Sequence, residues 1–269
     1  MPRLKNISKI WIEYFKNLKN KMKFSIIIEA RLSSTRFPGK ILYKIKKYSF
    51  LEYLIKRLKL LKSISEIIIA MPDDEQNKDI VLIAKKNRIK YFKGSHHNVI
   101  KRIIDTAKKF KCKNIVRITS DCPLIDLDII KNGIELFRQN NCDILTNGKI
   151  RSFPDGMDVE IFKLESLIKS YKYAKSKKEK EWPTWAMKNN NKFKVINFIS
   201  PPTLYWPELG LTLDEYKDFL FLKKIITHYN ERLEISCSEI LKYLRKNKKL
   251  LNINKSIKRK YTSYNRLMY

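Results

Sequence analysis

Three cationic side chains follow the first strongly apolar run of the chain. The run at 24–29 ends at Glu29, and Arg31, Arg36 and Lys40 come next. Cations held this close together repel one another unless an anion lies between them. Arg and Lys bind phosphates through charge-assisted hydrogen bonds. The spacing therefore predicts an anion site, and the simpler alternative is a solvated basic loop.

This loop matches neither of two common phosphate-binding loops. A Walker A loop that ends at Gly39 and Lys40 needs Gly at position 34 and Ser or Thr at position 41, where the chain has Ser34 and Ile41. The dinucleotide-binding fingerprint needs three glycines within six residues, and this loop has one. We therefore expect the anion to be held by the cations, the loop hydroxyls and backbone N–H groups.

A carboxylate stands at the corresponding place after another apolar run. Asp121 follows the run at 114–119 and precedes Pro123, which cannot continue a central strand. Mg²⁺ at nucleotide sites is usually held by one or two carboxylates together with substrate phosphates. Asp121 is thus a candidate Mg²⁺ ligand, and the alternative is an ordinary turn residue.

The elements that must position these residues alternate along the chain. Strands are predicted at 24–29, 66–70, 89–92, 114–119 and 143–146, and helices at 50–62, 76–87, 98–110 and 127–139. This alternation is typical of successive βαβ units, so we predict an α/β fold with a mostly parallel sheet and helices on both faces. Ligands of such sheets bind beyond the carboxyl ends of the strands, where the cation loop and Asp121 would both lie.

Three segments are predicted along the chain. Residues 1–21 have apolar side chains at helical spacing between lysines, which indicates an amphipathic helix that packs on the protein or makes a weak membrane-surface contact. Residues 22–246 form the main domain, in which a helix begins near Asp214 with that residue as its N-cap. Residues 247–269 form a basic, loosely ordered tail.

Composition restricts the class of protein. The 269 residues are 43% hydrophobic, as in ordinary globular proteins, and no apolar stretch has the roughly 18–20 residues of a membrane span. Without the apolar core of a signal peptide at its start, the chain is expected to be cytoplasmic. The net charge of +31 would suit a non-catalytic nucleic-acid-binding protein. The chain has no interleaved aromatic and basic platform of the RNA-binding type, so we expect no nucleic-acid partner.

Five segments, in chain order, resemble one enzyme family. They are "EARLSSTRFPGKIL", "FKGSHHNVIKRI", "VRITSDCPLID", "SFPDGMDVEIF" and "LTLDEYKDF". The chain is similar to the cytidylyltransferases of bacterial surface-glycan synthesis, most closely the spore-coat polysaccharide biosynthesis protein F type. The KDO and acylneuraminate cytidylyltransferases are more distant. The resemblance implies a nucleotide-diphospho-sugar transferase type fold, a homodimer, and Mg²⁺-dependent transfer of CMP from CTP to an acidic or surface-glycan sugar, with release of pyrophosphate.

The resemblance also implies roles for individual residues. The catalytic residues would be Arg31, Lys40 and Asp121, and the metal ligands Asp121 and Asp214. The nucleotide would be bound by Ala30, Arg31, Ser34, Arg36, Lys40, Ser95 and Asn98. The acceptor would be bound by Asp155, Asp158 and Glu160.

The sequence departs from the family pattern mainly on the sugar side. Glu29 stands where Gln is usual, and Trp182 and Pro183 stand where His and Val are expected. The phosphate and metal positions are intact, and the acceptor sugar stays open. A glycosyltransferase of the same fold is an alternative, because "DLD" at 126–128 has the form of a metal-binding D-x-D motif. Its position past Pro123 predicts instead the start of a helix.

Overall fold

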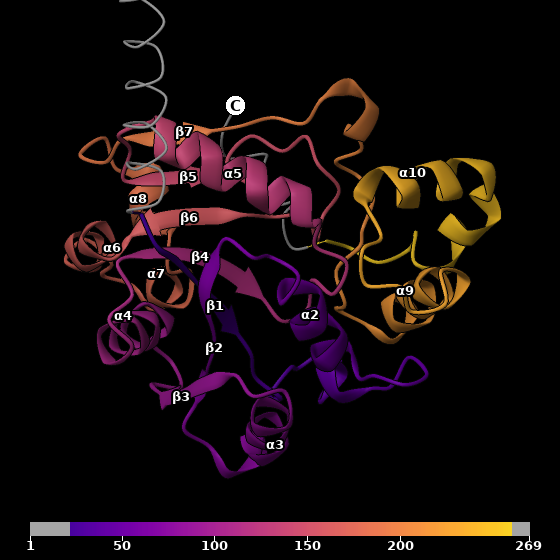
Figure 1. Ribbon diagram of the computed structural model, residues 1–269, viewed down its shortest axis with the longest axis horizontal. Helices are drawn as coiled ribbons and strands as arrows, with labels where there is room; N and C mark the ends of the chain where they lie inside the picture. The colour runs from indigo at the N-terminus through magenta and orange to yellow at the C-terminus, as the bar shows by residue number, and fades with distance from the viewer. Residues whose placement is uncertain (1–21, 260–269) are drawn as a thin grey trace, which may run out of the picture.

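One mixed sheet forms the centre of the protein. The computed structural model describes residues 22–259 (Figure 1), so the predicted N-terminal helix and its membrane contact lie outside the described residues. Within this range the strand order is β3-β2-β1-β4-β6-β5-β7. The strands are β1 (Phe24–Glu29), β2 (Ile64–Pro72), β3 (Lys90–Gly94), β4 (Asn114–Thr119), β5 (Ile144–Thr146), β6 (Glu160–Lys163) and β7 (Val195–Asn197). Only β6, among these, runs antiparallel to its neighbours, which confirms the mostly parallel sheet.

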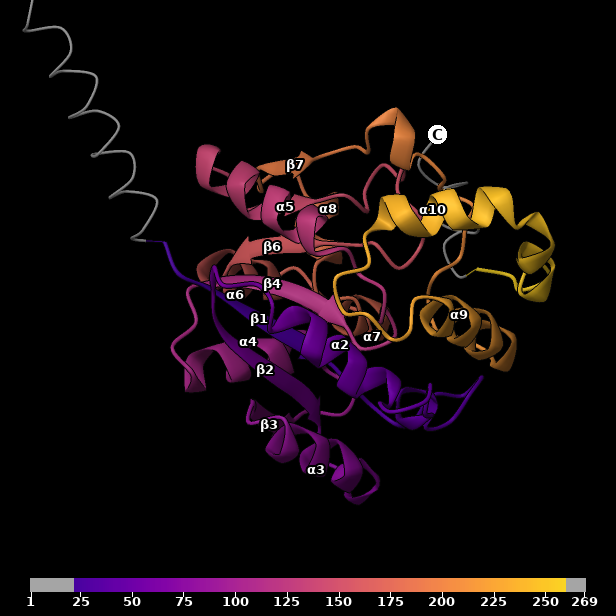
Figure 2. The ribbon, with the colours of Figure 1, turned by 45° about the vertical axis from the view of Figure 1, so that its right-hand side comes forward.

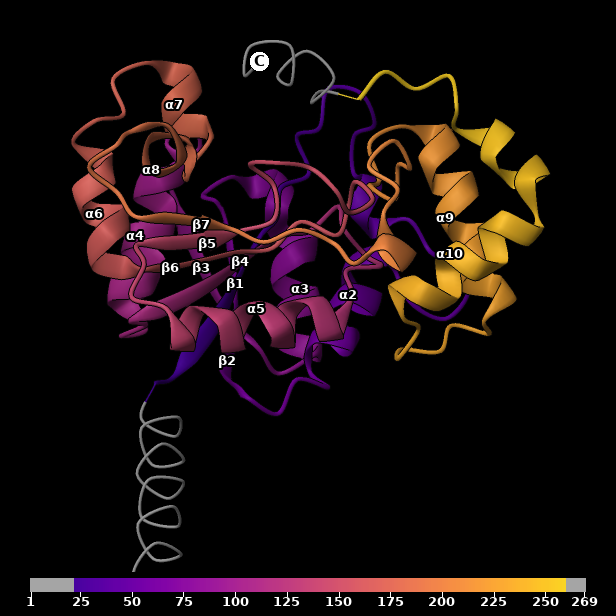
Figure 3. The same ribbon diagram turned by 90° about the horizontal axis from the view of Figure 1, so that it is seen from above.

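Helices cover both faces of the sheet, as predicted (Figure 3). One face carries α2 (Phe50–Leu58), α3 (Lys78–Lys86) and α5 (Leu127–Gln139), and the other carries α4 (Val99–Lys109), α6 (Leu164–Tyr171) and α8 (Trp185–Asn189). The central strand β1 is buried on both sides: Ile26 and Ile28 belong to one core and Ile27 to the other. Continuous apolar runs are expected for strands buried in this way.

The C-terminal helices lie together at one end of the sheet (Figure 2). They are α9 (Tyr216–His228) and α10 (Cys237–Lys246). The prediction that Asp214 caps α9 is wrong, because Glu215 is the N-cap. The Glu215 side chain accepts a hydrogen bond from the Asp218 backbone, and the Asp218 side chain accepts one from the Glu215 backbone. This reciprocal capping box leaves the Asp214 side chain available for other contacts.

Residues 248–259 pack on the two C-terminal helices, so the predicted loose order is wrong for this stretch. The 3₁₀ helix η4 (Lys248–Ile253) contacts α9 and α10. Ile257 is buried, and Arg259 forms an ion pair of 2.8 Å with the fully buried Asp218. This contact could not be predicted from the basic composition of the segment, because Arg259 pairs with Asp218, which lies 41 residues earlier. The division of the chain into three segments stays a prediction.

Candidate active site

The cation loop is a compact turn held by its own backbone. The carbonyl of Leu32 accepts hydrogen bonds from the backbone N–H groups of Ser34, at 2.8 Å, and Gly39, at 3.0 Å. Gly39 has a φ of 66°, in the left-handed region that favours glycine, and the 3₁₀ helix η1 (Lys40–Leu42) begins directly after it. The turn therefore brings Lys40 back beside the end of β1.

Two contacts from distant parts of the chain hold this loop in place. The buried side chain of Asn77, at the start of α3, accepts a hydrogen bond of 3.1 Å from the Leu32 backbone. Phe37, at the tip of the loop, packs its ring against Tyr43, Tyr216 and Phe219. The sequence analysis missed Asn77, because an isolated Asn carries no motif that indicates a long-range contact.

Lys40 joins the two carboxylates that were predicted as metal ligands. Its Nζ lies 3.0 Å from Asp121 Oδ2 and 3.2 Å from Asp214 Oδ1. Burial opposes the charged form of Lys40, but the two carboxylates outweigh burial and raise its pKa above the usual value. Burial opposes ionisation of Asp121 as well, yet Lys40 and a hydrogen bond from Thr119 lower its pKa. Lys40 and Asp121 therefore face each other as a charged pair at neutral pH.

The other two loop cations, Arg36 and Arg31, differ in whether they form ion pairs with carboxylates. Arg36 forms an ion pair of 2.6 Å with Asp214 and a longer one of 3.6 Å with Glu215. Arg31 is exposed, and no carboxylate within residues 22–259 forms an ion pair with it. The premise that all three cations lack a partner is thus wrong for Arg36 and Lys40. Both form ion pairs with Asp214, which lies far along the chain, just before α9.

Backbone contacts fix the distance between the two carboxylates. The Leu213 N–H donates a hydrogen bond of 2.8 Å to the Asp121 carbonyl. Asp218 accepts a 3.0 Å hydrogen bond from the Asp214 backbone and is itself paired with Arg259. The capping box of α9 and the C-terminal Arg259 therefore support the loop that presents Asp214.

The two carboxylates suit a hard cation. Asp121 Oδ2 and Asp214 Oδ1 both lie about 3 Å from the same Lys40 nitrogen, so they converge on one small region. Carboxylate oxygens are the protein ligands that Mg²⁺ prefers. No cluster of three or more His, Cys, Asp or Glu suited to a metal occurs within residues 22–259. Two carboxylates that need phosphate oxygens to complete the coordination are the arrangement typical of Mg²⁺–nucleotide sites.

A cavity of about 210 Å³ opens over this cluster. Of the residues predicted for catalysis, metal or nucleotide, those that line it are Ala30, Arg31, Ser34, Arg36, Lys40, Asp121 and Asp214. The cavity is also lined by Arg102 from α4, a fourth cation that the sequence analysis did not select. Arg102 donates a hydrogen bond of 2.7 Å to the Ser95 carbonyl, so it also holds the loop before α4.

Ser95 and Asn98 do not line this cavity, because both are used at the start of α4. The Ser95 hydroxyl accepts a hydrogen bond from the Asn98 backbone, and the Asn98 side chain caps the helix at the Lys101 backbone. The Asn98 amide also donates to the Tyr171 hydroxyl, at 2.7 Å. Their predicted contact with the nucleotide stays a prediction.

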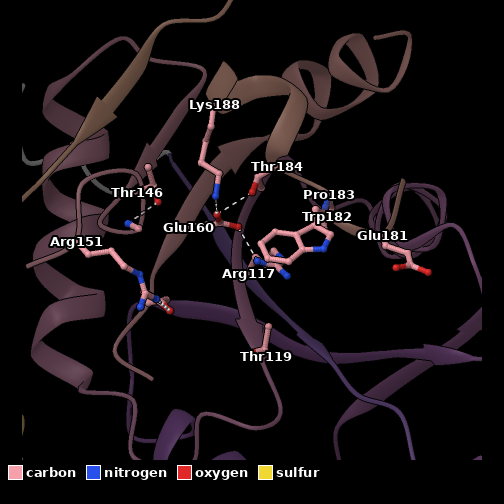
Figure 4. Close-up of a pocket in the computed structure, with 12 residues that line it drawn as sticks. Arg117, Thr119, Thr146, Arg151, Glu160, Glu181, Trp182, Pro183, Thr184 and Lys188 are labelled. Atoms are coloured by element: carbon pink, nitrogen blue, oxygen red, sulfur yellow. Dashed lines mark hydrogen bonds and ion pairs between the residues drawn. The ribbon is translucent and has the colours of Figure 1, made fainter. Parts of the chain in front are cut away.

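A second cavity opens beside the first. Figure 4 shows side chains that line it from β4, β6 and the α7–α8 region, where α7 is Lys177–Glu181. Thr119, Glu181 and Trp182 line both cavities, so the two adjoin. Asp158 and Glu160, two of the three predicted acceptor residues, line the second cavity. The third predicted residue, Asp155, does not line it but is buried, paired with Arg151 and with the Thr212 hydroxyl.

A series of ion pairs forms part of the wall of the second cavity. Arg117 on β4 contacts both oxygens of Glu29 on β1 and, at 2.7 Å, Glu160 on β6. The other Glu160 oxygen accepts from Thr184 and Lys188, each at 2.7 Å. Burial opposes ionisation of Glu160, but the charges of Lys188 and Arg117 lower its pKa to about 2. Glu160 therefore stays ionised and links β6 to β4 through Arg117 and to α8 through Lys188.

Glu160→Gln is expected to lower the free energy of unfolding by roughly 3 kcal/mol at pH 7, because Lys188 loses its carboxylate partner and Arg117 keeps only Glu29. The folded-state pKa of about 2 lies below the ordinary 4.5. The stability from this carboxylate is therefore present above about pH 4.5 and is lost as the pH falls toward 2. Urea unfolding of both proteins at pH 7 and pH 4 should show a smaller difference at pH 4.

Glu165→Gln, at an exposed position on α6, is the matched control and should change stability by less than about 0.5 kcal/mol at either pH. A Glu160→Gln effect of equal size at both pH values would contradict a role for the Glu160 charge.

Comparison with known proteins matches most of the chain to one family. The model of the cytidylyltransferase family matches residues 25–257, which include both cavities and the stretch packed on α9. The chain belongs to the cytidylyltransferase family. The predicted family is thereby confirmed, and the matched range extends past residue 246 into the segment that had been predicted as a tail.

Individual proteins resemble this chain in sequence or in fold. A solved cytidylyltransferase from Leptospira borgpetersenii is 32% identical, with a TM-score of 0.83, covering 88% of this chain and 100% of the other. The spore coat polysaccharide biosynthesis protein SpsF of Bacillus subtilis is 26% identical over 82% of this chain and 93% of its own length. CMP:2-keto-3-deoxy-manno-octonic acid synthetase, solved in complex with CTP, shares the fold at 12% identity, with a TM-score of 0.59 over 77% of this chain and 99% of its own.

One further observation concerns membranes. Within residues 22–259, no helix is both long and apolar enough to cross a bilayer.

Proposed function

We propose that this cytidylyltransferase transfers CMP from CTP to a hydroxyl of a surface-glycan sugar and releases pyrophosphate. The observation that carries the proposal is the ionic cluster of Lys40, Asp121 and Asp214 beneath a cavity also lined by Arg31 and Arg36. Four phosphate-binding cations, counting Arg102, suit a triphosphate. The relatives named above include a polysaccharide-biosynthesis protein and an enzyme solved with CTP.

The chemistry needs alignment and charge neutralisation more than covalent catalysis. The acceptor hydroxyl, placed in the second cavity, attacks the α-phosphorus. The bond from this phosphorus to the bridging oxygen breaks, and pyrophosphate leaves with the electron pair while a nearby carboxylate takes the hydroxyl proton. Arg31 and Lys40 neutralise the charge that grows on pyrophosphate. Mg²⁺, held by Asp121 and Asp214 together with phosphate oxygens, would polarise the α-phosphate.

The glycosyltransferase alternative has less support from the residues of the "DLD" motif. Asp126 is the N-cap of α5, and one of its oxygens accepts from the Asp128 and Ile129 backbones. Its other oxygen accepts from the Cys237 backbone. Both carboxylate oxygens of Asp126 thus accept backbone hydrogen bonds, and Asp126 lines neither of the two cavities.

CTP with Mg²⁺ is expected to stabilise the protein more than ATP, GTP or UTP does. A ligand that binds only the folded state adds about 2.7 kcal/mol at a concentration about 100 times its Kd. Thermal unfolding with each nucleotide, with and without Mg²⁺, measures the difference. Equal shifts for all four nucleotides would remove the cytidylyl assignment. Hydrolysis of a nucleotide sugar without release of pyrophosphate would favour the glycosyltransferase.

A further inference from the structure

A fully buried carboxylate at the start of α9, that of Asp218, is paired with a cation from far along the chain. One terminal guanidinium nitrogen of Arg259 lies 2.8 Å from Asp218 Oδ1, and the other lies 3.2 Å from Oδ2. These two contacts form the planar fork that Arg makes with a carboxylate. The Asn254 amide donates a further hydrogen bond of 2.9 Å to Oδ1. The stretch at 254–259 therefore holds the Asp218 side chain in one orientation.

The same carboxylate holds the backbone at Asp214. Asp218 Oδ2 accepts hydrogen bonds of 3.0 Å from the backbone N–H groups of Asp214 and Glu215. Because the Asp218 side chain is 0% exposed, loss of its cation would leave a buried charge uncompensated. Removal of Arg259 is therefore expected to displace the Asp218 carboxylate and to loosen the Asp214 backbone.

Arg259 also contacts the residue that precedes this part of the backbone by two positions. It donates a hydrogen bond of 3.2 Å to the Thr212 hydroxyl. Between Thr212 and Asp214, the Leu213 N–H donates to the Asp121 carbonyl. One guanidinium thus supports the chain on both sides of the hydrogen bond that joins it to Asp121. The place of this guanidinium therefore bears on the distance between the two active-site carboxylates.

A glycine makes room for the guanidinium. The Gly210 backbone lies directly against Arg259, and a Cβ atom added to Gly210 would collide with the guanidinium. The φ of Gly210 lies outside the left-handed region, so its backbone conformation suits alanine as well. Since the colliding atoms are the end of a flexible side chain, Gly210→Ala is expected to move the guanidinium and to leave the backbone in place.

We propose that Arg259 is a positioning residue of the active site, which holds Asp214 opposite Asp121 and thereby supports the binding of CTP with Mg²⁺. The inference rests on the proposed function, because it takes these two carboxylates as the metal ligands. Arg259 is not among the residues that line either cavity, so it acts through Asp218. It also lies just beyond the range matched to the family, which ends at residue 257. Loss of a group that orients a metal ligand typically lowers metal affinity about 10- to 100-fold.

The test is a calorimetric titration that gives the Kd of CTP, once with excess Mg²⁺ and once with EDTA, at a temperature where each protein is folded. Arg259→Ala is expected to raise the Kd with Mg²⁺ by about tenfold or more. The Kd in EDTA should stay within about twofold of wild type, because the cations that line the cavity remain. A residue that only stabilised the fold would lower the unfolding temperature and leave the ratio of the two Kd values unchanged.

Gly210→Ala is a second and milder variant, because it displaces the guanidinium but keeps the positive charge nearby. It should also raise the Kd with Mg²⁺ and leave the Kd in EDTA unchanged. The double variant Gly210→Ala/Arg259→Ala has no guanidinium to displace, so it should bind CTP as Arg259→Ala alone does. Lys258→Ala, which removes an exposed cation from the neighbouring position, is the control and should bind CTP as wild type does.

A wild-type ratio of the two Kd values in folded Arg259→Ala would overturn the inference. If Arg259→Ala does not fold, the same ratio in Gly210→Ala decides the question. Losses that add in the double variant would contradict the contact between Gly210 and Arg259 on which the inference depends. An equal loss in Lys258→Ala would assign the effect to net charge, and it would also overturn the positioning role.

The proposed function fails by a different result. A wild-type enzyme that binds CTP no more tightly than ATP, GTP or UTP loses the cytidylyl assignment, and the inference is lost with it. If wild type and Arg259→Ala both bind CTP selectively and with the same response to Mg²⁺, the proposed function stands. Only the positioning role of Arg259 is then lost.

Discussion

Asp121→Asn is expected to lower acceptor-dependent pyrophosphate release by about 10³-fold or more while the fold is kept. Asn has nearly the shape of Asp but lacks its negative charge, so one of two carboxylates available to Mg²⁺ is lost. Lys40 also keeps only one of its two partners. A readout that needs no acceptor is the part of the CTP stabilisation that depends on Mg²⁺, and this part should nearly disappear.

Asp128→Asn is the matched control for this experiment. Asp128 is a largely exposed residue at the start of α5 and forms a solvent-exposed ion pair of 2.8 Å with Lys131. Its loss should leave turnover within about twofold of wild type, because exposed ion pairs contribute little. Activity lost in Asp128→Asn but kept in Asp121→Asn would place the metal at the D-x-D motif and favour the glycosyltransferase.

Lys40→Ala is expected to reduce turnover by about 10²-fold, as when one preorganised electrostatic group is removed from an active site. The variant takes away a cation that faces the triphosphate and leaves Asp121 and Asp214 to repel each other. The loss should fall mainly on the chemical step, since Arg31, Arg36 and Arg102 still line the cavity in which we propose that the phosphates bind. Steady-state kinetics with CTP as the varied substrate separate kcat from KM.

Lys44→Ala, four residues further on, removes an exposed lysine and serves as the control. Thermal unfolding of both variants shows whether any loss of activity comes from loss of folded protein. Near-normal turnover in folded Lys40→Ala would mean that the catalytic centre lies elsewhere.

Local patterns in the sequence predicted the central elements well. The bounds of β1, β4 and α5 agree with prediction, because isoleucine-rich runs and a capped amphipathic helix are signals contained within a few residues. The family resemblance then brought Arg31, Lys40, Asp121 and Asp214 to one site. The length of β2 was underestimated at both ends, because Ser65 interrupts the apolar run at the start and Pro72, an unfavourable strand residue, ends it.

Contacts between distant residues could not be predicted in this way. Asp214 looked like a helix cap from its neighbours alone, and only the fold shows that Glu215 caps α9 while Asp214 reaches Lys40. Asn77 and Arg259 support the site through partners 45 and 41 residues away. The pairing of each cavity cation with a carboxylate likewise depends on strand register, which places Arg117 opposite Glu160.

The separation of Lys40 and Asp214 has a consequence for how the enzyme is made. The two residues are 174 positions apart, and Asp121 lies between them. At a translation rate of about 5–20 residues per second, roughly 10–35 s pass between the synthesis of one and of the other. During this interval the nascent chain has the cation loop without its Asp214 partner. Under the proposed function, the ability to use CTP arises only after the segment with Asp214 has emerged from the ribosome, so we expect a chain stalled before residue 214 to be inactive.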